Sequence, residues 1–190
     1  MDTKPLIFWG ATGQSIMLEE CLRQTFHLEA IFDNNPKITS PFKDVPINYG
    51  WETFLTWLDK KRNNHLSYMV AIGGGHGEIR LEIHEKIKNL GLKPISAIHN
   101  SSYVSVDAIL AEGIQVLPNA TINPRVSIGK CSIINTAASI DHECTIGNGV
   151  HIGPSVTLAG CIEIGDYSFI GTNSTILPKL KIGKKRNKQE

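Results

Sequence analysis

The segment INTAASIDHECTIGNGVHIGPSVTLAGCIEIG, residues 134–165, has an aliphatic residue at every sixth position. The same interval continues on both sides without a slip, through Ile98, Val104, Leu110, Val116, Ile122, Ile128, Ile134, Ile140, Ile146, Ile152, Leu158, Ile164, Ile170, Ile176 and Ile182. An α-helix repeats about every 3.6 residues and a strand about every 2, so neither keeps one residue in six inward for so long. A hexapeptide-repeat β-helix does, and the series predicts one for the second half of the chain.

The residue four places after each member of the series is often small or β-branched, as a second inward position requires: Ser102, Ala108, Ala120, Val126, Ser132, Ala138, Val150, Val156, Ser168 and Ser174. Three hexads make one coil, and coils stack at about the inter-strand distance of 4.8 Å. Residues 18 apart are therefore predicted to be stacked neighbours. Because no insertion interrupts the register, no long loop is expected to leave the β-helix.

The first half of the chain alternates short apolar runs with amphipathic stretches. Its pattern predicts strands at 6–9, 28–32 and 67–72 and helices at 16–26, 52–61 and 78–90. Such alternation gives a small parallel α/β sheet, since each crossover needs a helix. We therefore expect one domain over residues 1–97, a β-helix domain over 98–183 and a solvated basic tail over 184–190.

Charge and cysteine content exclude several classes of protein. The formal net charge is +1 and the basic residues form no stripe, which argues against nucleic-acid binding. The four cysteines lack CxxC spacing, so reduced thiols in a cytoplasmic protein are expected. No segment approaches the roughly 20 apolar residues of a membrane span, and the apolar start is too short for a signal peptide.

Two loops of the first half are candidates for ligand binding, because both follow strand C-termini. The turn Gly10-Ala11-Thr12-Gly13 opens a helix and offers backbone N–H groups to a phosphate, although an ordinary strand-to-helix turn looks the same. Asp33 either accepts hydrogen bonds from a ribose or a base, or simply begins the turn that Pro36 ends. Together they favour a nucleotide.

The strongest chemical signal is Asp141-His142-Glu143, which departs from the small turn residues of the other hexads. A histidine near the prism surface, held by a carboxylate, is suited to take a proton from an attacking amine or hydroxyl. Gly160 stands 18 residues after His142 and leaves a notch over the imidazole. The competing interpretation is an inert surface histidine.

A metal site is not expected. Only His142 and His151 lie in the repeats beyond their start, half a coil apart, so one subunit does not assemble a zinc site from them. The cysteines at hexad positions are interpreted as packing residues.

The chain resembles the bacterial family of sialic acid O-acetyltransferases and UDP-4-amino-sugar N-acetyltransferases. The resemblance is carried by 7–15 (IFWGATGQS), 31–36 (IFDNNP), 70–80 (VAIGGGHGEIR), 98–105 (IHNSSYVS), 133–144 (IINTAASIDHEC) and 151–160 (HIGPSVTLAG). It implies a Rossmann-like domain that binds a nucleotide sugar, followed by a left-handed parallel β-helix. It further implies a homotrimer that binds acetyl-CoA, as co-substrate and without a metal, between subunits.

The same resemblance assigns roles residue by residue. His142 looks like the general base that deprotonates the sugar amine for direct attack on acetyl-CoA, and Glu143 looks like the carboxylate that raises its basicity. His151, Gly160 and Thr172 match positions that contact acetyl-CoA. The positions that match nucleotide-sugar contacts are Thr12, Gly13, Gln14, Asp33, Asn34, Gly73 and Asn135.

The expected activity is acetyl transfer to the 4-amino group of a UDP-linked amino-deoxy sugar for bacterial surface glycan synthesis. The alternatives are acetylation of a sugar hydroxyl, as in sialic acid, or a nucleotide-sugar-binding trimer without activity. Family members have a glycine-and-asparagine loop where this chain has Gly73-Gly74-Gly75-His76-Gly77, and they continue for further coils beyond the position of Ile182.

Overall fold

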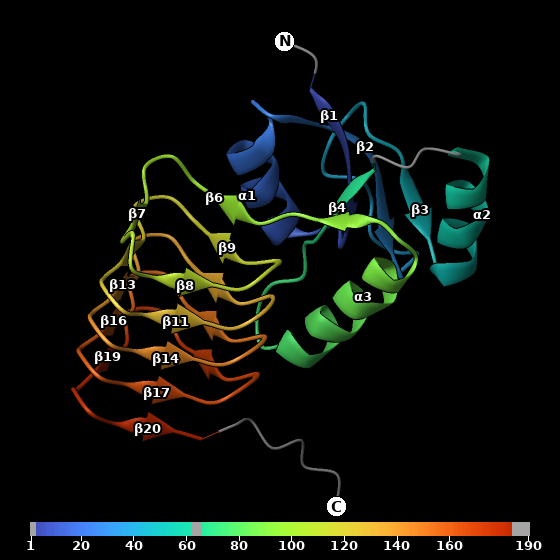
Figure 1. Cartoon of the computed structure of the whole chain (residues 1–190). Helices are drawn as coiled ribbons and strands as arrows, with labels where there is room; N and C mark the ends of the chain where they lie inside the picture. Colours follow the sequence, from blue (N-terminus) through green and yellow to red (C-terminus); the bar gives the residue numbers. More distant parts are fainter. Residues whose placement is uncertain (1–2, 62–65, 184–190) are drawn as a thin grey trace, which may run out of the picture. The chain divides into compact units, whose positions relative to one another are not determined.

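The computed structural model describes residues 3–61 and 66–183, and its contacts divide the chain into two units (Figure 1). The first unit comprises Met1–Ile72 and Glu82–Ile95, and the second comprises Gly73–Leu81 and Ser96–Glu190. The predicted basic tail at 184–190 lies outside the described residues.

The first unit is built on a parallel five-stranded sheet with the order β3-β2-β1-β4-β5. Its strands are β1 Lys4–Trp9, β2 Phe26–Asp33, β3 Ile47–Tyr49, β4 Ser67–Val70 and β5 Lys93–Pro94. The helices are α1 Gly13–Leu22, α2 Trp51–Lys61 and α3 Gly77–Asn89, of which α3 begins among the residues of the second unit. The parallel α/β sheet predicted from the sequence is confirmed.

Several element boundaries differ from the sequence prediction. Helix α1 ends at Leu22 instead of residue 26, because Arg23 and Thr25 donate backbone hydrogen bonds that close the last turn and Phe26 already pairs with Lys4 of β1. Strand β4 ends at Val70 instead of residue 72. Strand β3 was not predicted, because three half-buried residues carry too little periodic signal.

An aromatic cluster fills one face of this sheet. Trp9 and Phe32, neighbours on β1 and β2, lie with ring centroids 6.1 Å apart, and Phe54 of α2 packs edge-on against both at 5.6 and 4.9 Å. All three side chains are buried. This packing fixes the ends of β1 and β2, from which the candidate nucleotide loops leave.

The second unit is the β-helix, made of three five-stranded parallel sheets. One contains β6 Ala97–Ile98, β9 Gln115–Val116, β12 Ile133–Ile134, β15 His151–Ile152 and β18 Phe169–Ile170. The next contains β7 Tyr103–Val104, β10 Thr121–Ile122, β13 Ser139–Ile140, β16 Thr157–Leu158 and β19 Thr175–Ile176. The last contains β8 Ile109–Leu110, β11 Ser127–Ile128, β14 Thr145–Ile146, β17 Glu163–Ile164 and β20 Lys181–Ile182.

Every strand pair in these sheets joins residues 18 apart, for example Ile122 with Ile140 and Ile140 with Leu158, which confirms the predicted stacking. The ladder residues from Val116 to Ile170 are buried. Ile98 was predicted to point inward but is 47% exposed, because no earlier coil of the unit covers it.

The turns of the β-helix share one backbone feature. The residue three places after a ladder position repeatedly has a positive φ, as at Arg125, Glu143 and Cys161. Side chains rarely adopt this left-handed conformation, so its recurrence at 18-residue spacing makes these turns stack in one orientation.

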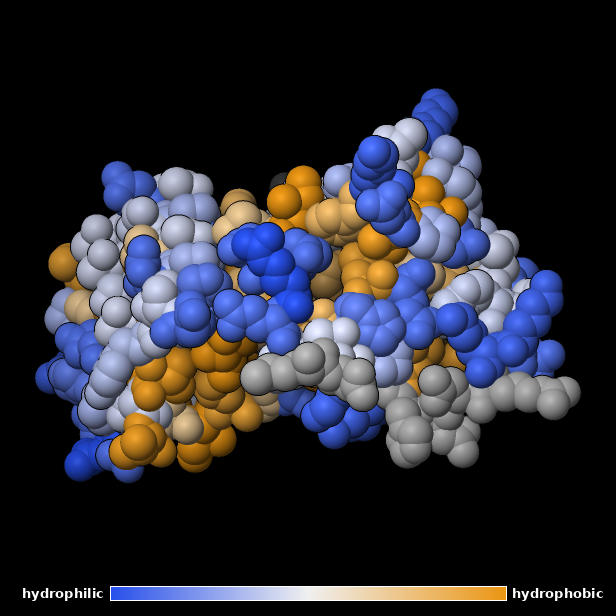
Figure 2. Space-filling view, turned by 90° about the horizontal axis from the view of Figure 1, so that it is seen from above, coloured by the Kyte–Doolittle hydropathy of each residue, from blue (hydrophilic) through white to orange (hydrophobic). Residues whose placement is uncertain are grey.

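Apolar side chains are also exposed on the β-helix unit. Val106 and Ile109 of the first coil are 99% and 71% exposed. Figure 2 shows apolar surface gathered at the left of the molecule, over this unit.

Within residues 3–61 and 66–183, no helix has both the length and the apolar character that crossing a bilayer requires.

Candidate active site

His142 and Glu143 occupy the turn after β13. His142 Nδ1 lies 3.2 Å from Glu143 Oε2, and both side chains are about half exposed. An ionised carboxylate only accepts hydrogen bonds, so Nδ1 carries the proton and donates it. This tautomer leaves the lone pair of Nε2 free to accept a proton from a substrate.

Glu143 is the middle member of a column of turn residues in stacked coils. Arg125 Nη1 lies 3.0 Å from Glu143 Oε1, and Cys161 Sγ lies 3.7 Å from Glu143 Oε2. The hydrogen bond from Arg125, and after it the one from His142, lowers the pKa of Glu143. Glu143 is therefore ionised at neutral pH and keeps the imidazole in the tautomer described above.

Gly160 lies against the other side of the imidazole. A β-carbon added to Gly160 would lie 2.6 Å from His142 Nε2 and 2.7 Å from Cε1. Any other residue would therefore occupy the space beside the basic nitrogen. The structure thus places Gly160 beside His142, as the 18-residue spacing predicts.

His151 has a different environment from that of His142. It is buried on β15, where its ring packs against Phe169 at 5.2 Å. Its Nδ1 lies 3.2 Å from the carbonyl oxygen of Gly74, so Nδ1 is the donor, and Nε2 accepts a hydrogen bond from Asn135 Nδ2 at 3.0 Å. Burial lowers the pKa of His151 to about 4, and it is neutral at neutral pH.

The glycine loop at 73–77 belongs to the same unit as His151. Gly77 approaches Gly149 so closely that a β-carbon on Gly77 would lie 1.9 Å from the Gly149 carbonyl oxygen. Arg80 is fully buried and donates hydrogen bonds to the carbonyl oxygens of Cys131 and Gly149. The structure therefore brings Asn135 and Gly74, the chain neighbour of Gly73, to the ring of His151, whereas Thr172 is exposed in the turn after β18.

The loops of the first unit meet at Asp33. Its Oδ2 accepts a hydrogen bond from the Ala11 N–H at 3.1 Å, and its Oδ1 accepts one from the Asn35 N–H at 2.9 Å. Asp33 thus forms the expected turn and also ties it to the glycine loop before α1. Of the other residues of this unit that are predicted to contact the nucleotide sugar, Thr12, Gly13 and Asn34 are exposed. Gln14 is buried.

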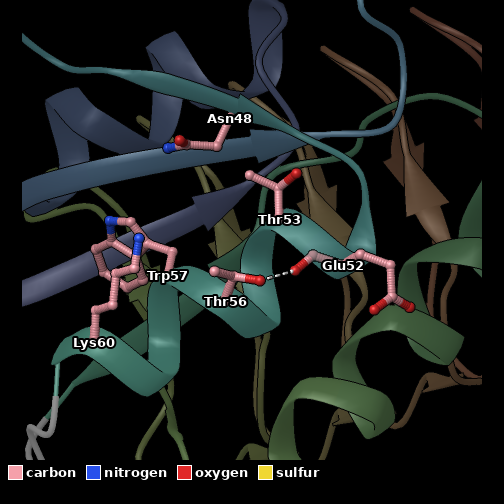
Figure 3. A pocket seen from close by; sticks show the side chains of 6 residues that line it. All are labelled: Asn48, Glu52, Thr53, Thr56, Trp57 and Lys60. Atoms are coloured by element: carbon pink, nitrogen blue, oxygen red, sulfur yellow. Dashed lines mark hydrogen bonds between the residues drawn. The ribbon is translucent and has the colours of Figure 1, made fainter.

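A cavity of about 330 Å³ lies elsewhere in the first unit, between β3 and α2. It is lined by Asn48, Glu52, Thr53, Thr56, Trp57 and Lys60 (Figure 3). The Glu52 carboxylate points away from Trp57 and Lys60 in this view. None of the residues predicted to bind a nucleotide sugar lines this cavity.

Arg125 and Cys161 are the two residues of the site that the sequence analysis missed. Both are found by the spacing that identified Gly160, since they stand 18 residues before and after Glu143. None of the four cysteines is in a disulfide in the structure, as expected, and the half-buried Cys161, interpreted above as a packing residue, also hydrogen-bonds to Glu143.

Comparisons with known proteins agree with this fold. The family model described as bacterial transferase hexapeptide (six repeats) matches residues 143–178. A perosamine N-acetyltransferase from Caulobacter crescentus, solved as a histidine-to-asparagine mutant with CoA and GDP-perosamine, is 30% identical with a TM-score of 0.84. The match covers 95% of this chain and 83% of that one.

Two further solved structures are similar over nearly the whole chain. The acetyltransferase domain of PglB from Neisseria gonorrhoeae, in complex with acetyl coenzyme A, is 27% identical with a TM-score of 0.81, covering 96% of this chain and 86% of that one. WeeI from Acinetobacter baumannii shares the fold, at 20% identity and a TM-score of 0.78, over 96% of this chain and 90% of that one.

Proposed function

The chain belongs to the bacterial hexapeptide-repeat acyltransferases, and from that premise we propose that it transfers the acetyl group of acetyl-CoA to the 4-amino group of a nucleotide-linked amino-deoxy sugar. The observation that carries the proposal is the pair His142 Nδ1 and Glu143 Oε2 at 3.2 Å, with Gly160 beside the opposite ring nitrogen. It is the arrangement that a proton-accepting imidazole needs.

His142 acts as the general base in this reaction. The amine nitrogen of the sugar adds to the thioester carbonyl carbon, and its surplus proton passes to His142 Nε2. Glu143 stabilises the imidazolium that results, because its carboxylate already accepts the Nδ1 hydrogen bond. The carbon–sulfur bond then breaks, the amide remains on the sugar, and the proton on Nε2 neutralises the departing thiolate of CoA.

Gly160 sets the position of this base. Because Gly160 has no side chain, the imidazole lies directly against its backbone, and the amine approaches Nε2 from the exposed side of the ring. The direct transfer needs no acetyl-enzyme. Among the other residues assigned to acetyl-CoA, exposed Thr172 is available to the coenzyme, whereas His151 is buried and already hydrogen-bonded at both ring nitrogens. We therefore assign to His151 the role of holding the glycine loop and Asn135 in place.

The loops at Ala11–Gly13 and Asp33–Asn34 take the nucleotide part of the acceptor. One support is the exposed start of α1, where backbone N–H groups favour a phosphate. The other is the hydrogen bond from the Ala11 N–H to Asp33, which holds the two loops together. UDP is the nucleotide we expect, and GDP is the one bound to the Caulobacter relative. The acceptor panel must therefore include both.

The assembly we propose is a homotrimer with the active sites between subunits. Its support is the exposed position of His142 and the exposed apolar residues of the β-helix, such as Val106 and Ile109, which a neighbouring subunit would cover. Light scattering after size exclusion measures the mass directly, and a monomer of 20.9 kDa at working concentration contradicts the assembly.

The activity is tested by release of free CoA from acetyl-CoA with UDP-, dTDP- and GDP-linked 4-amino sugars, and with sialic acid as a hydroxyl acceptor. We expect turnover with an amino sugar, and we expect the His142→Ala substitution to lower kcat by a factor of at least about 100. Turnover with the hydroxyl acceptor alone would assign O-acetylation. Full activity of His142→Ala would refute the general base.

A further inference from the structure

We propose that His142, Glu143 and Cys161 form a site for a divalent transition-metal ion of the zinc type, which inhibits the enzyme by occupying the nitrogen that Glu143 normally holds. One ligand atom from each residue, an imidazole nitrogen, a carboxylate oxygen and a thiol sulfur, lies within 4.8 Å of the other two. The inhibitory effect rests on the proposed function of His142, whereas the binding of the metal does not.

The distances suit a tetrahedral ion. His142 Nδ1 and Cys161 Sγ lie 3.2 and 3.7 Å from the same atom, Glu143 Oε2. Zinc binds nitrogen and oxygen at about 2.0–2.2 Å and sulfur at about 2.3 Å, so the edges of its tetrahedron are about 3.4 to 3.6 Å. Small rotations of exposed side chains bring the three atoms to those separations, and solvent supplies the fourth ligand.

The donor set decides which metals bind. A thiolate with an imidazole selects zinc and similar borderline ions over Mg²⁺ and Ca²⁺, which prefer oxygen ligands. Binding releases the thiol proton of Cys161, and the single imidazole proton of His142 moves from Nδ1 to Nε2. The backbone already holds the ligands in register, because the N–H of Cys161 donates to the carbonyl oxygen of His142 at 3.0 Å.

A metal on Nδ1 changes the chemistry of Nε2. In a neutral imidazole only one ring nitrogen carries hydrogen, so a metal on Nδ1 leaves the proton on Nε2. Nε2 then donates and no longer accepts a proton from the sugar amine. Inhibition by this route requires no contact between the metal and either substrate.

Arg125 opposes the metal. Its guanidinium lies 3.0 Å from Glu143 Oε1 and offsets the carboxylate charge that would attract a cation. Removing Arg125 and removing Cys161 should therefore change metal affinity in opposite directions. This pair of effects separates a built site from non-specific metal binding.

The test uses the metals alone on the purified full chain. Co²⁺ is titrated while the thiolate-to-cobalt absorption is recorded, and Zn²⁺ is then added in competition. For the wild type we expect one Co²⁺ per chain and a thiolate-to-cobalt absorption band. For Cys161→Ser we expect loss of the band and about 100-fold weaker Zn²⁺ binding. For Arg125→Gln we expect tighter metal binding. The matched control is Cys21→Ser, which alters a thiol of the first unit and should leave both readouts unchanged.

Zn²⁺ inhibition of CoA release is measured on the same variants, with Cys161→Ser predicted to need about 100-fold more metal. Unchanged Co²⁺ absorption or unchanged Zn²⁺ affinity in Cys161→Ser would overturn the site. If the absorption follows the prediction but no acceptor is turned over, the metal site stands and the proposed function fails. If the metal binds as predicted and activity is unaffected, the inhibitory role is wrong.

Discussion

Gly160 lies beside the imidazole of His142, with room for no side chain between them: a β-carbon on Gly160 would be 2.6 Å from His142 Nε2. The two residues stand 18 apart, in adjacent coils. Strain is not the reason for glycine here, because Gly160 is not among the residues with positive φ. The relationship is steric, and it involves His142 Nε2, the atom that we propose accepts the proton of the sugar amine.

Replacement of Gly160 by alanine should lower activity while leaving the fold intact. The clash is with an exposed, rotatable imidazole, so the ring swings aside at little cost in stability. Displacement of a catalytic group by about 1 Å costs roughly 100-fold in rate. We expect a loss of that order in kcat/KM, measured by CoA release, with an unchanged melting temperature.

The control for this substitution is Gly171→Ala, since the nearest atom to an added β-carbon at Gly171 is 3.8 Å away. Equal activities of the two variants would show that the position of the His142 imidazole against Gly160 does not matter for catalysis.

The Glu143→Gln variant tests the carboxylate as a positioning group. Glutamine keeps the shape but removes the charge that stabilises the imidazolium and that Arg125 also contacts. We expect kcat to fall about 10-fold or more, with the KM for acetyl-CoA nearly unchanged, because the lost interaction strengthens only as charge develops on His142.

Glu163→Gln is the matched control, as Glu163 is an exposed carboxylate of the same unit that pairs with Lys181 at 2.8 Å. A purely structural Glu143 would change the melting temperature and leave kcat close to that of the control.

The stacking of the β-helix was predictable because its periodicity is a local property of the sequence. One residue in six must face inward, so 18-residue arithmetic placed Gly160 beside His142 and would also have placed Arg125 and Cys161 beside Glu143. The cysteine was missed because it was judged by residue type instead of by its place in the column.

The environment of His151 was not predictable in this way. Its partner Gly74 is 77 residues away, and their contact depends on a loop that packs on the β-helix by a close approach of two glycine backbones. No periodic pattern encodes such a contact. For a similar reason β3 escaped detection, since its pairing with β2 compensates for a short and half-polar sequence.

The burial of His151 should make stability depend on pH. Its pKa is about 4 in the folded chain and 6.5 when unperturbed, so between these values the unfolded chain binds the extra proton. Stability therefore rises with pH across this window. The free energy of unfolding begins to decrease as the pH falls below about 6.5, and this group causes no further decrease below about pH 4.

In His151→Gln this dependence should disappear. From pH 7 to pH 5 the wild type should lose about 2 kcal/mol more unfolding free energy than the variant, measured by urea denaturation at one protein concentration. The titrations of the exposed groups are common to both proteins and cancel. Parallel pH dependences would mean that His151 is accessible to protons in the folded state.

The approach of Gly77 to Gly149 predicts a large effect of a single methyl group. A β-carbon on Gly77 would lie 1.9 Å from the Gly149 carbonyl oxygen, a backbone atom that cannot rotate away. The loop must therefore shift, which weakens the hydrogen bond from His151 Nδ1 to Gly74 and those from Arg80 to Cys131 and Gly149. We expect Gly77→Ala to destabilise the fold by about 2–3 kcal/mol.

For a chain of this length such a loss lowers the melting temperature by about 5–10 °C, as measured by calorimetry or circular dichroism. Gly171→Ala, whose added methyl group would make only an ordinary contact with Ser174 Oγ at 3.8 Å, should have the melting temperature of the wild type. The shifted loop should also raise the pKa of His151 towards its ordinary value, because burial is the main cause of its low pKa. An unchanged melting temperature together with an unchanged His151 titration would show that the loop does not pack on Gly149 in solution.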